Sequence, residues 1–381
     1  MKRGSSGAIS GGVGGVGVGL LAMALARGQS GTARPDAEKP KMAEEVYKNI
    51  QTFKGTPADQ LIPAMQFFTA SLGVTCDYCH DVDDRSRDDK KTKQTARRMV
   101  RMMLALNKNN FEGRPEVTCY SCHHGAETPP AIPSLTMLYS PNPPVPEDSD
   151  DIGEPKPGTV PSAEQLLEKY VEALGGPQAV AKVTSFVGKG TVDIEGQKSP
   201  IEVYVQAPGL RAVIMHLPDG DSAETYDGHS GWIIAPGEPV RAMGRSALGG
   251  AKMDADLGFA VHVQQHFPPL RVGFRTTIGE RGANVVMGSN EGKLPVKLYF
   301  DERSGLLARL VRYIESPVGR DPVQIDYEEY RDVGGLKVPF RWSVAQLSRR
   351  YTIQLDQVEQ NVPIDHATFA KPAPPQKPPL S

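Results

Sequence analysis

The hydrophobic and polar positions divide the chain into a helical first part and a strand-rich second part. Before residue 130, apolar residues recur at helical spacing, as in the series Leu61, Met65 and Phe68. After residue 190, apolar and polar residues alternate, as around Ile201 and Val203, which is typical of strands with one buried face. The pattern predicts an α+β protein, all-α in its N-terminal part and built on a β-sheet in its C-terminal part.

The helical part contains three predicted helices. They are a short helix over residues 42–50, a second that ends at Gly73, and a third over residues 90–107. The second helix contains Pro63, which has no amide donor and clashes with the preceding turn. This helix therefore either kinks at the proline or begins near Leu61.

The second part begins with a helix and continues as a series of hairpins. Ser162 and Gln165 form a capping box at the start of the helix, and Gly175 ends it. Strands are predicted over residues 201–205, 232–234, 296–300, 306–314, 323–330, 336–344 and 351–358. Turn residues separate successive strands, so the sheet is expected to be antiparallel.

Composition adds a division into domains. A chain of 381 residues is long enough for two ordinary domains. Proline and glycine concentrate at the start, the middle and the end, which predicts a linker over residues 129–161 and a disordered tail over 371–381. One domain is then expected over 42–128 and the other over 162–370. The formal net charge is −2 without a block of one sign, so nothing indicates nucleic acid binding.

Residues 1–26 have the features of an export signal. Lys2 and Arg3 precede an apolar stretch from Gly11 to Ala26, which ends in a small-x-small sequence suited to cleavage. The stretch is shorter than a comfortable membrane span, and its retention as an anchor is the alternative. Cleavage predicts a periplasmic protein.

All four cysteines lie in two motifs of the form Cys-x-x-Cys-His. The motifs consist of Cys76, Cys79 and His80, and of Cys119, Cys122 and His123. Two thiols one helical turn apart can add to the two vinyl groups on one edge of a haem, and the following histidine can then bind the iron. The motifs therefore predict two covalently bound c-type haems with the two histidines as iron ligands.

Other uses of these cysteines stay open at this point. Two Cys pairs can form a four-cysteine zinc site, although the gap between them is wider than in compact zinc ribbons. Two disulfides are possible in an exported protein. A thioredoxin-like redox motif would need a βαβ setting, which the pattern lacks.

The second ligand of each iron is expected from the helix that precedes the motif. Met65 lies eleven residues before Cys76, within reach of a haem held there, although most methionines are core residues. The third helix carries an apolar stripe with Met99, Met102 and Met103. The arginines beside this stripe are either partners for haem propionates or part of a solvated face.

Residues 42–130 resemble the photosynthetic reaction-centre cytochrome c subunit family. The resemblance lies in the segments Ala64-Met65-Gln66 to Cys79-His80, Arg97-Arg98-Met99 to Asn107, and Val117-Thr118-Cys119-Tyr120-Ser121-Cys122-His123. In that family, a helix with an axial Met precedes each attachment motif. The resemblance implies that Met65 and Met99 are axial ligands, with Met102 and Met103 as weaker candidates.

This chain departs from the family in ways that bear on its function. Members that serve a reaction centre carry four haem motifs, whereas this chain has two. It also lacks the lipid-anchor Cys of some members, and His124 stands where the family usually has Arg. The resemblance thus implies an electron carrier with redox partner proteins, for which a membrane-bound electron-transfer complex is a candidate, more than a role in photosynthesis.

The second part resembles the outer-membrane lipoprotein-carrier fold, a curved half-barrel closed by helices. Residues 239–268 would form the loop-and-helix lid across its concave side. The concavity of such folds holds acyl chains or another apolar ligand, and the alternative is a docking domain without a ligand. Within the lid, His262 and His266 lie one helical turn apart and could bind a metal. No Glu follows the first His as in metalloproteases, so ordinary histidines are the favoured interpretation.

Together these features predict a periplasmic di-haem c-type cytochrome that carries electrons and is not an enzyme. One alternative is a periplasmic carrier of an apolar ligand with a haem redox or sensor domain. Another is a haem peroxidase, which needs an iron with an open coordination position.

Overall fold

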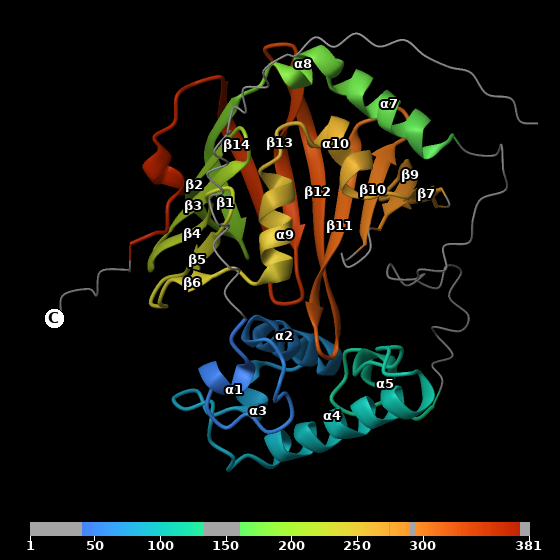
Figure 1. Ribbon diagram of the computed structural model, residues 1–381, viewed down its shortest axis with the longest axis vertical. Coiled ribbons are helices and arrows are strands. Elements are labelled where there is room, and N and C mark those ends of the chain that lie inside the picture. Colours follow the sequence, from blue (N-terminus) through green and yellow to red (C-terminus); the bar gives the residue numbers. More distant parts are fainter. Residues whose placement is uncertain (1–39, 133–160, 274, 290–294, 374–381) are drawn as a thin grey trace, which may run out of the picture. The chain divides into compact units, whose positions relative to one another are not determined.

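The computed structural model describes residues 40–132, 161–273, 275–289 and 295–373. The predicted signal peptide, nearly all of the predicted linker and most of the predicted tail lie outside the described residues. The described residues have the predicted α+β fold, with helices in the first region and a large antiparallel sheet with flanking helices in the second (Figure 1). Among them, no helix combines the length and the apolar character that crossing a bilayer requires.

The first region is helical. Its elements are α1 (Ala43–Val46), η1 (Ala58–Gln60), α2 (Leu61–Leu72), α3 (Cys76–Cys79), α4 (Lys91–Asn110) and α5 (Tyr120–His123). Helix α2 begins at Leu61, so Pro63 lies in its first turn, where amide groups have no partner within the helix. It ends at Gly73, as predicted, and the φ of 66° at this residue is left-handed.

Two predicted helices have different lengths in the structure. The helix predicted over residues 42–50 is only α1, because Tyr47 already has an extended backbone. The helix predicted over residues 90–107 is α4, which continues to Asn110. The Asn107 carbonyl in the last turn accepts a hydrogen bond from the Phe111 amide at 2.9 Å, which satisfies one of the open carbonyls at the helix end.

The second region is a sheet flanked by helices. The helices are α7 (Ala163–Leu174), α8 (Pro177–Ala181), α9 (Arg245–Asp254), α10 (Phe259–His266) and η2 (His366–Phe369). The strands are β1 (Ser185–Ile194), β2 (Gln197–Gln206), β3 (Leu210–Leu217), β4 (Gly220–Tyr226), β5 (Gly231–Ile234), β6 (Arg241–Ala242), β7 (Leu270–Val272), β8 (Thr276–Ile278), β9 (Arg281–Gly288), β10 (Val296–Asp301), β11 (Leu307–Ser316), β12 (Gly319–Val333), β13 (Leu336–Ala345) and β14 (Arg350–Gln360). Their spatial order is β6-β5-β4-β3-β2-β1-β14-β13-β12-β11-β10-β9-β7, and β8 pairs with β9.

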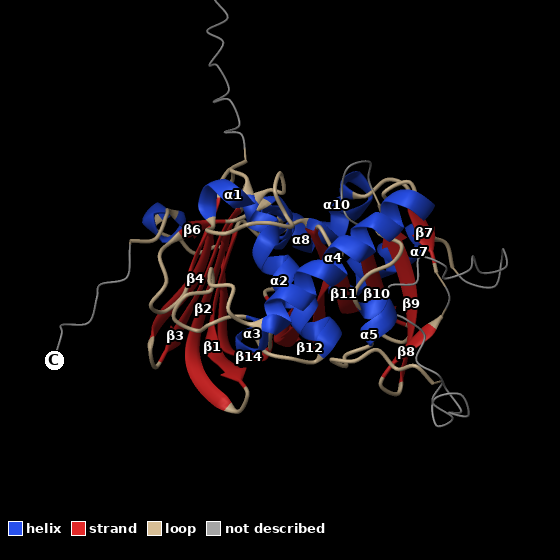
Figure 2. Ribbon diagram, turned by 90° about the horizontal axis from the view of Figure 1, so that it is seen from below, coloured by secondary structure: helices blue, strands red, loops and turns tan. Residues whose placement is uncertain are grey.

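The order of the strands explains the position of α9 and α10. Strands β6 and β7 follow each other in the chain but lie at opposite edges of the sheet. The segment between them must therefore cross the sheet, and α9 and α10 do so along one face (Figure 1). The sheet is curved, and α10 lies with α7 and α8 on one side of it (Figure 2). Ala260 and Val263 of α10 are buried in the main hydrophobic core. The lid expected over residues 239–268 thus exists as two helices.

Several strands, β1 among them, have no predicted counterpart. In β1, Gly188 and Gly190 interrupt the apolar alternation that marks a strand. A Cβ atom at Gly190 would lie 2.0 Å from the Gln354 carbonyl oxygen of β14. The pairing of β1 with β14 also shifts its register between Lys189 and Gly190. The glycines that weaken the sequence pattern are therefore needed for the close approach of two strands.

Asp321 of β12 leads to a prediction about stability. The residue is 3% exposed, and neither carboxylate oxygen has a hydrogen-bond partner within the described part of the chain. Burial raises the pKa of Asp321 to about 7, whereas the pKa of an unfolded Asp is ~3.9. Between these values the folded chain holds a proton that the unfolded chain has lost. The free energy of unfolding therefore falls as the pH rises from about 4 to about 7.

The substitution Asp321→Asn removes this titration. At pH 8 we expect the variant to be more stable than the wild type by about 2–4 kcal/mol, and at pH 5 by much less. Calorimetric melting at the two pH values measures the difference, with Asp219→Asn in the exposed β3–β4 turn as a control. Equal shifts in Tm at both pH values would contradict the prediction.

Candidate functional site

The two Cys-x-x-Cys-His motifs form the one-turn helices α3 and α5. All four cysteines are free thiols, so the structure does not contain the two disulfides considered as an alternative. In the described part of the chain, the only group of three or more ligand atoms within 4.8 Å of one another lies outside the motifs. The four sulfur atoms therefore do not converge, and the geometry does not fit a four-cysteine zinc site.

The surroundings of the thiols differ from those of a redox-active pair. Burial raises the pKa of Cys119 to about 11, and it also raises the pKa of Cys79. Cysteines of thioredoxin-like motifs have a lowered pKa, because the thiolate is the reactive form. Cys79 and Cys119 therefore differ from the activated thiol of a dithiol oxidoreductase.

The two motif histidines have the same hydrogen-bond arrangement. The Nδ1 atom of His80 lies 2.8 Å from the Arg85 carbonyl oxygen, and Nδ1 of His123 lies 2.9 Å from the Ala126 carbonyl oxygen. Because a carbonyl only accepts, Nδ1 carries the proton in both rings, and Nε2 carries the lone pair. Burial is the main reason why the pKa of His80 is lowered, which favours the neutral ring. Both rings therefore present Nε2 in the form that can bind a metal, and the backbone contact at Nδ1 is of the kind that usually orients a metal-binding imidazole.

Helix α2 places Met65 on a partly exposed apolar face. Its buried face includes Ala64 and Phe67, which belong to a hydrophobic cluster with Val100 and Met103 of α4 and with Val318 of the β11–β12 turn. Met65 and Phe68 are only half-buried and lie beside this face. The structure thus leaves an apolar surface around Met65, which fits a haem that covers it.

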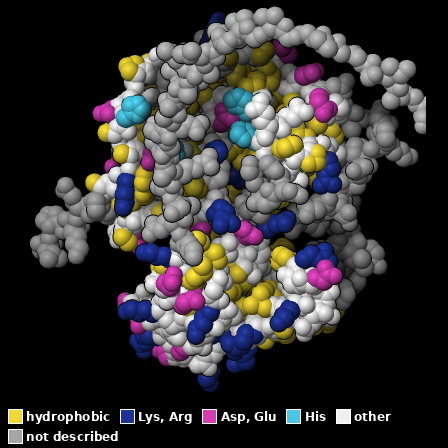
Figure 3. All heavy atoms as spheres, in the orientation of Figure 1, with side chains coloured by type: hydrophobic (Ala, Val, Ile, Leu, Met, Phe, Trp, Pro, Cys, Tyr) yellow, Lys and Arg dark blue, Asp and Glu magenta, His cyan; other side chains and the backbone are white. Residues whose placement is uncertain are grey.

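Helix α4 separates the three methionine candidates. Met103 is 6% exposed and belongs to the core of the helical region, so it is a packing residue. Met99, Met102 and Leu106 are 41%, 56% and 37% exposed, respectively. They lie three and four residues apart and form one exposed apolar face of the helix. Figure 3 shows apolar side chains at the surface of the helical region. This face of α4 fits a second haem and leaves Met99 and Met102 as candidates.

Two of the three arginines of α4, Arg97 and Arg98, have partners within the protein. Arg97 forms an ion pair with Asp88 at 2.8 Å and donates to the Asn49 carbonyl at 3.2 Å. Arg98 donates to the Thr95 hydroxyl at 2.9 Å. Arg97 therefore fastens the loop before α4, and the two arginines contribute to local structure.

Each motif helix packs on the Met-bearing helix of the other motif. Helix α3 contacts α4, where the Thr92 hydroxyl donates to the Tyr78 carbonyl at 2.6 Å. Helix α5 contacts α2, and the Gly125 amide that follows α5 donates to the Ser71 carbonyl at 2.9 Å. A Cβ atom at Gly73 would lie 2.2 Å from the Gly125 oxygen, so this approach needs glycine. The two motifs thus belong to one packed unit.

Sequence reasoning missed two polar residues that support the motifs. Lys93 is 8% exposed, and its ammonium donates to the Arg85 carbonyl at 2.9 Å, the same carbonyl that His80 contacts. Asn107 is 4% exposed and bonds both to the amide and to the carbonyl of Val117, just before the second motif. The two residues lie seven positions on either side of the buried Val100. Polar residues at heptad spacing within an apolar stripe are a signal that could have identified them.

Comparison with known proteins points to one family for the first region. Residues 22–143 match the family described as photosynthetic reaction centre cytochrome C subunit. Over 123 residues the chain is 30% identical to the photosynthetic reaction center cytochrome c subunit of Thermochromatium tepidum, which covers 31% of this chain and 29% of that protein. It is also 31% identical over 84 residues to cytochrome c-554 of Chloroflexus aurantiacus, at 20% of each chain. The chain thus spans less than a third of the length of these relatives.

Solved structures are similar to the second region. A DUF1329 family protein from Desulfovibrio piger matches 54% of this chain and 96% of its own, with 10% identity and a TM-score of 0.38. A LolA superfamily protein from Nitrosomonas europaea matches 56% of this chain and 99% of its own, with 14% identity and a TM-score of 0.37.

In sequence, residues 22–143 of this chain are similar to the cytochrome c subunit of photosynthetic reaction centres.

Proposed function

We propose that the protein is a periplasmic di-haem c-type cytochrome that carries electrons between redox partner proteins. The haem-binding domain would span residues 42–128, and residues 129–161 would join it to a sheet domain over 162–370. The observation that supports this most is the matching Nδ1 contact of His80 and His123, which presents Nε2 to an iron in both motifs. The similarity of residues 22–143 to reaction-centre cytochrome c subunits supports the same class of protein.

Each haem would be held by its motif and by one methionine. The proposed sets are Cys76, Cys79, His80 and Met65 for the first haem, and Cys119, Cys122, His123 and Met99 for the second. The bound haem supplies a one-electron couple between ferric and ferrous iron. The half-exposed apolar faces of α2 and α4 would exclude water from it.

The proposed ligands favour an electron carrier over an enzyme. With a histidine and a methionine both bound to an iron, no coordination position would remain for a substrate. A thioether ligand also raises the reduction potential relative to a nitrogen ligand. The chain's own contribution is then to fix the ligands and shield the iron.

A redox titration tests the function. The full-length protein would be produced in a host that matures c-type cytochromes, and its absorbance would be followed against potential. Two reversible one-electron steps, without carbon monoxide binding to the ferrous protein, would support a carrier. Carbon monoxide binding or fast reaction with hydrogen peroxide at either iron would show an open position and support a peroxidase.

The apolar-ligand alternative has weaker support. A cavity of about 180 Å³ is lined by residues of α7, α10 and the sheet, among them Tyr170, Phe259 and Tyr330. Pockets for drug-sized ligands usually have volumes of roughly 300–1,000 Å³. This cavity has room for a small apolar group only. A second, wider pocket of about 340 Å³ beside α7 and α10 is lined in part by Glu164, Glu168 and Glu172, which do not suit an acyl chain. A docking or scaffold role for the sheet domain is therefore the better proposal.

Lys93 gives a prediction about the first haem. Its ammonium and His80 Nδ1 both donate to the Arg85 carbonyl, at 2.9 and 2.8 Å. Substitution Lys93→Met removes a positive charge and frees the carbonyl to accept more strongly from the imidazole. Both effects stabilise ferric iron, so we expect the potential of the first haem to fall by on the order of tens of millivolts.

The same titration measures this shift. Lys91→Met removes an exposed charge from the same helix and serves as the matched control. The second haem should keep its potential in both variants. A potential that stays unchanged in Lys93→Met, or that falls equally in Lys91→Met, would mean that the shared carbonyl does not tune the site.

A further inference from the structure

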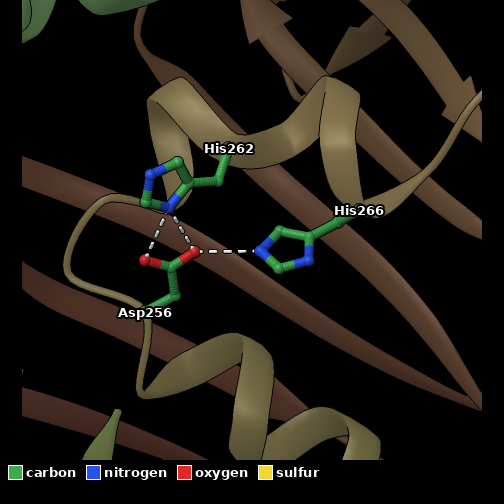
Figure 4. Close-up of side chains that lie close together, drawn as sticks. All are labelled: Asp256, His262 and His266. Atoms are coloured by element: carbon green, nitrogen blue, oxygen red, sulfur yellow. Dashed lines mark hydrogen bonds and ion pairs between the residues drawn. The ribbon is translucent and has the colours of Figure 1, made fainter. Parts of the chain in front are cut away.

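Three side chains with metal-binding atoms meet on the face of the sheet that α9 and α10 cover. Asp256 lies in the loop between these helices, and His262 and His266 lie one turn apart on α10. Both rings point toward the carboxylate, the His262 ring from above and the His266 ring from the right in the view of Figure 4. The nearest ligand atoms of the three residues lie within 4.8 Å of one another.

The distances suit a single ion. His262 Nδ1 lies 2.9 Å and His266 Nε2 also 2.9 Å from the same carboxylate oxygen of Asp256. In a tetrahedral site with metal–ligand distances of about 2.1 Å, neighbouring ligand atoms are roughly 3.4 Å apart. The two nitrogens therefore need to move away from the oxygen by about half an ångström, which a change of side-chain torsion supplies.

Neighbouring residues hold the three groups in place. The Gly258 amide donates to Asp256 Oδ1 at 2.9 Å, which fixes the carboxylate. A Cβ atom at Gly258 would lie 2.6 Å from His262 Cε1, so the glycine makes room for that ring. The Phe259 ring stacks on His266, with centroids 6.5 Å apart and an angle of 18° between the planes. Such contacts to the outer side of metal ligands orient them and raise affinity.

We propose that Asp256, His262 and His266 form a binding site for a divalent transition-metal ion, with Zn²⁺ as the best match. Two imidazoles and one carboxylate are the ligands that Zn²⁺ takes in proteins, whereas Mg²⁺ and Ca²⁺ prefer oxygen ligands. Three protein ligands leave the fourth position of a tetrahedral site for water or an anion. The side chains of Asp256, His262 and His266 are 18%, 44% and 31% exposed, so an ion can enter from solvent. Figure 3 shows histidine side chains beside an acidic one on this face.

This site goes beyond the sequence interpretation, which favoured ordinary histidines. The third ligand, Asp256, precedes His262 by six residues in a loop, so no helical spacing marks it. The site uses none of the residues proposed to hold haem. The result of a metal-binding test at this site therefore does not depend on whether the electron-transfer proposal is correct.

Isothermal titration of the chelator-treated, full-length protein with Zn²⁺ tests the site. We expect one ion per chain, and a rise in Tm when Zn²⁺ is present. His262→Gln and Asp256→Asn should each weaken binding at least about 100-fold, because loss of a ligand costs more than loss of an outer contact. His229→Gln, which changes an exposed histidine in the β4–β5 turn, should bind as the wild type does.

Two results would overturn the proposal. One is that no ion binds while His262→Gln still lowers Tm, which would mean that the histidines only fasten the loop between α9 and α10. The other is that wild type and both variants bind Zn²⁺ equally, which would place the ion elsewhere, for example on cysteines without haem.

Discussion

Replacement of Cys76 and Cys79 by serine is expected to lower the covalently bound haem from two per chain to one. A serine oxygen cannot form the thioether bond that a cysteine sulfur forms with a haem vinyl group, and His80 alone would hold the haem only reversibly. The remaining haem would be the one attached to Cys119 and Cys122. Haem stained on a denaturing gel and the absorbance of the pyridine complex measure the loss.

The second motif supplies the matched control. Serine at positions 119 and 122 should also leave one haem per chain, now on the first motif, and the two single-haem proteins should have different potentials. Because each motif helix packs on the helix of the other motif, limited proteolysis would show whether the remaining site is still folded. Two covalent haems in either variant would refute the assignment of the motifs.

Replacement of Met65 or Met99 by alanine is expected to convert one iron from low spin to high spin. Each substitution removes a proposed axial ligand, and water or an empty position would replace it. The potential of that haem should fall strongly, because a thioether stabilises ferrous iron. Two measurements report this change. The ferric protein should lose its long-wavelength absorption band, and its electron paramagnetic resonance spectrum should change from low spin to high spin.

Met102 and Met103 are controls on the same helix. Met102→Ala removes a methionine of the exposed face of α4, and Met103→Ala removes one from its core. Neither should change the spin state, although Met103→Ala should cost about 2–5 kcal/mol of stability. High-spin iron in Met102→Ala together with low-spin iron in Met99→Ala would show that Met102, one helical turn further along α4, is the ligand in place of Met99.

The sequence predicts the three longest helices, α2, α4 and α7, and about half of the strands, because their signals are local. The capping box at Ser162 and the helix end at Gly73 need only neighbouring residues. Strand β1 is harder, because its glycines are explained only by the approach of β14, whose residues lie more than 150 positions later. Long-range packing of this kind leaves no local pattern.

The candidate haem site also has residues that the sequence predicts and contacts that it does not predict. The cysteines and histidines follow from motif spacing, whereas the carbonyls of Arg85 and Ala126 that orient the rings carry no sequence signal, since every residue has a carbonyl. Burial of Met103 distinguishes it from Met99, although the two have the same side chain. Exposure after folding, and not residue type, separates a ligand candidate from a core residue here.

The mass of the intact chain tests the central claim most directly. The full-length protein would be exported from a host that matures c-type cytochromes, denatured, and weighed by mass spectrometry. The di-haem proposal predicts the polypeptide plus two haems, because thioether bonds survive denaturation. A mass equal to that of the polypeptide alone, with the four cysteines free, paired or holding zinc, would contradict it.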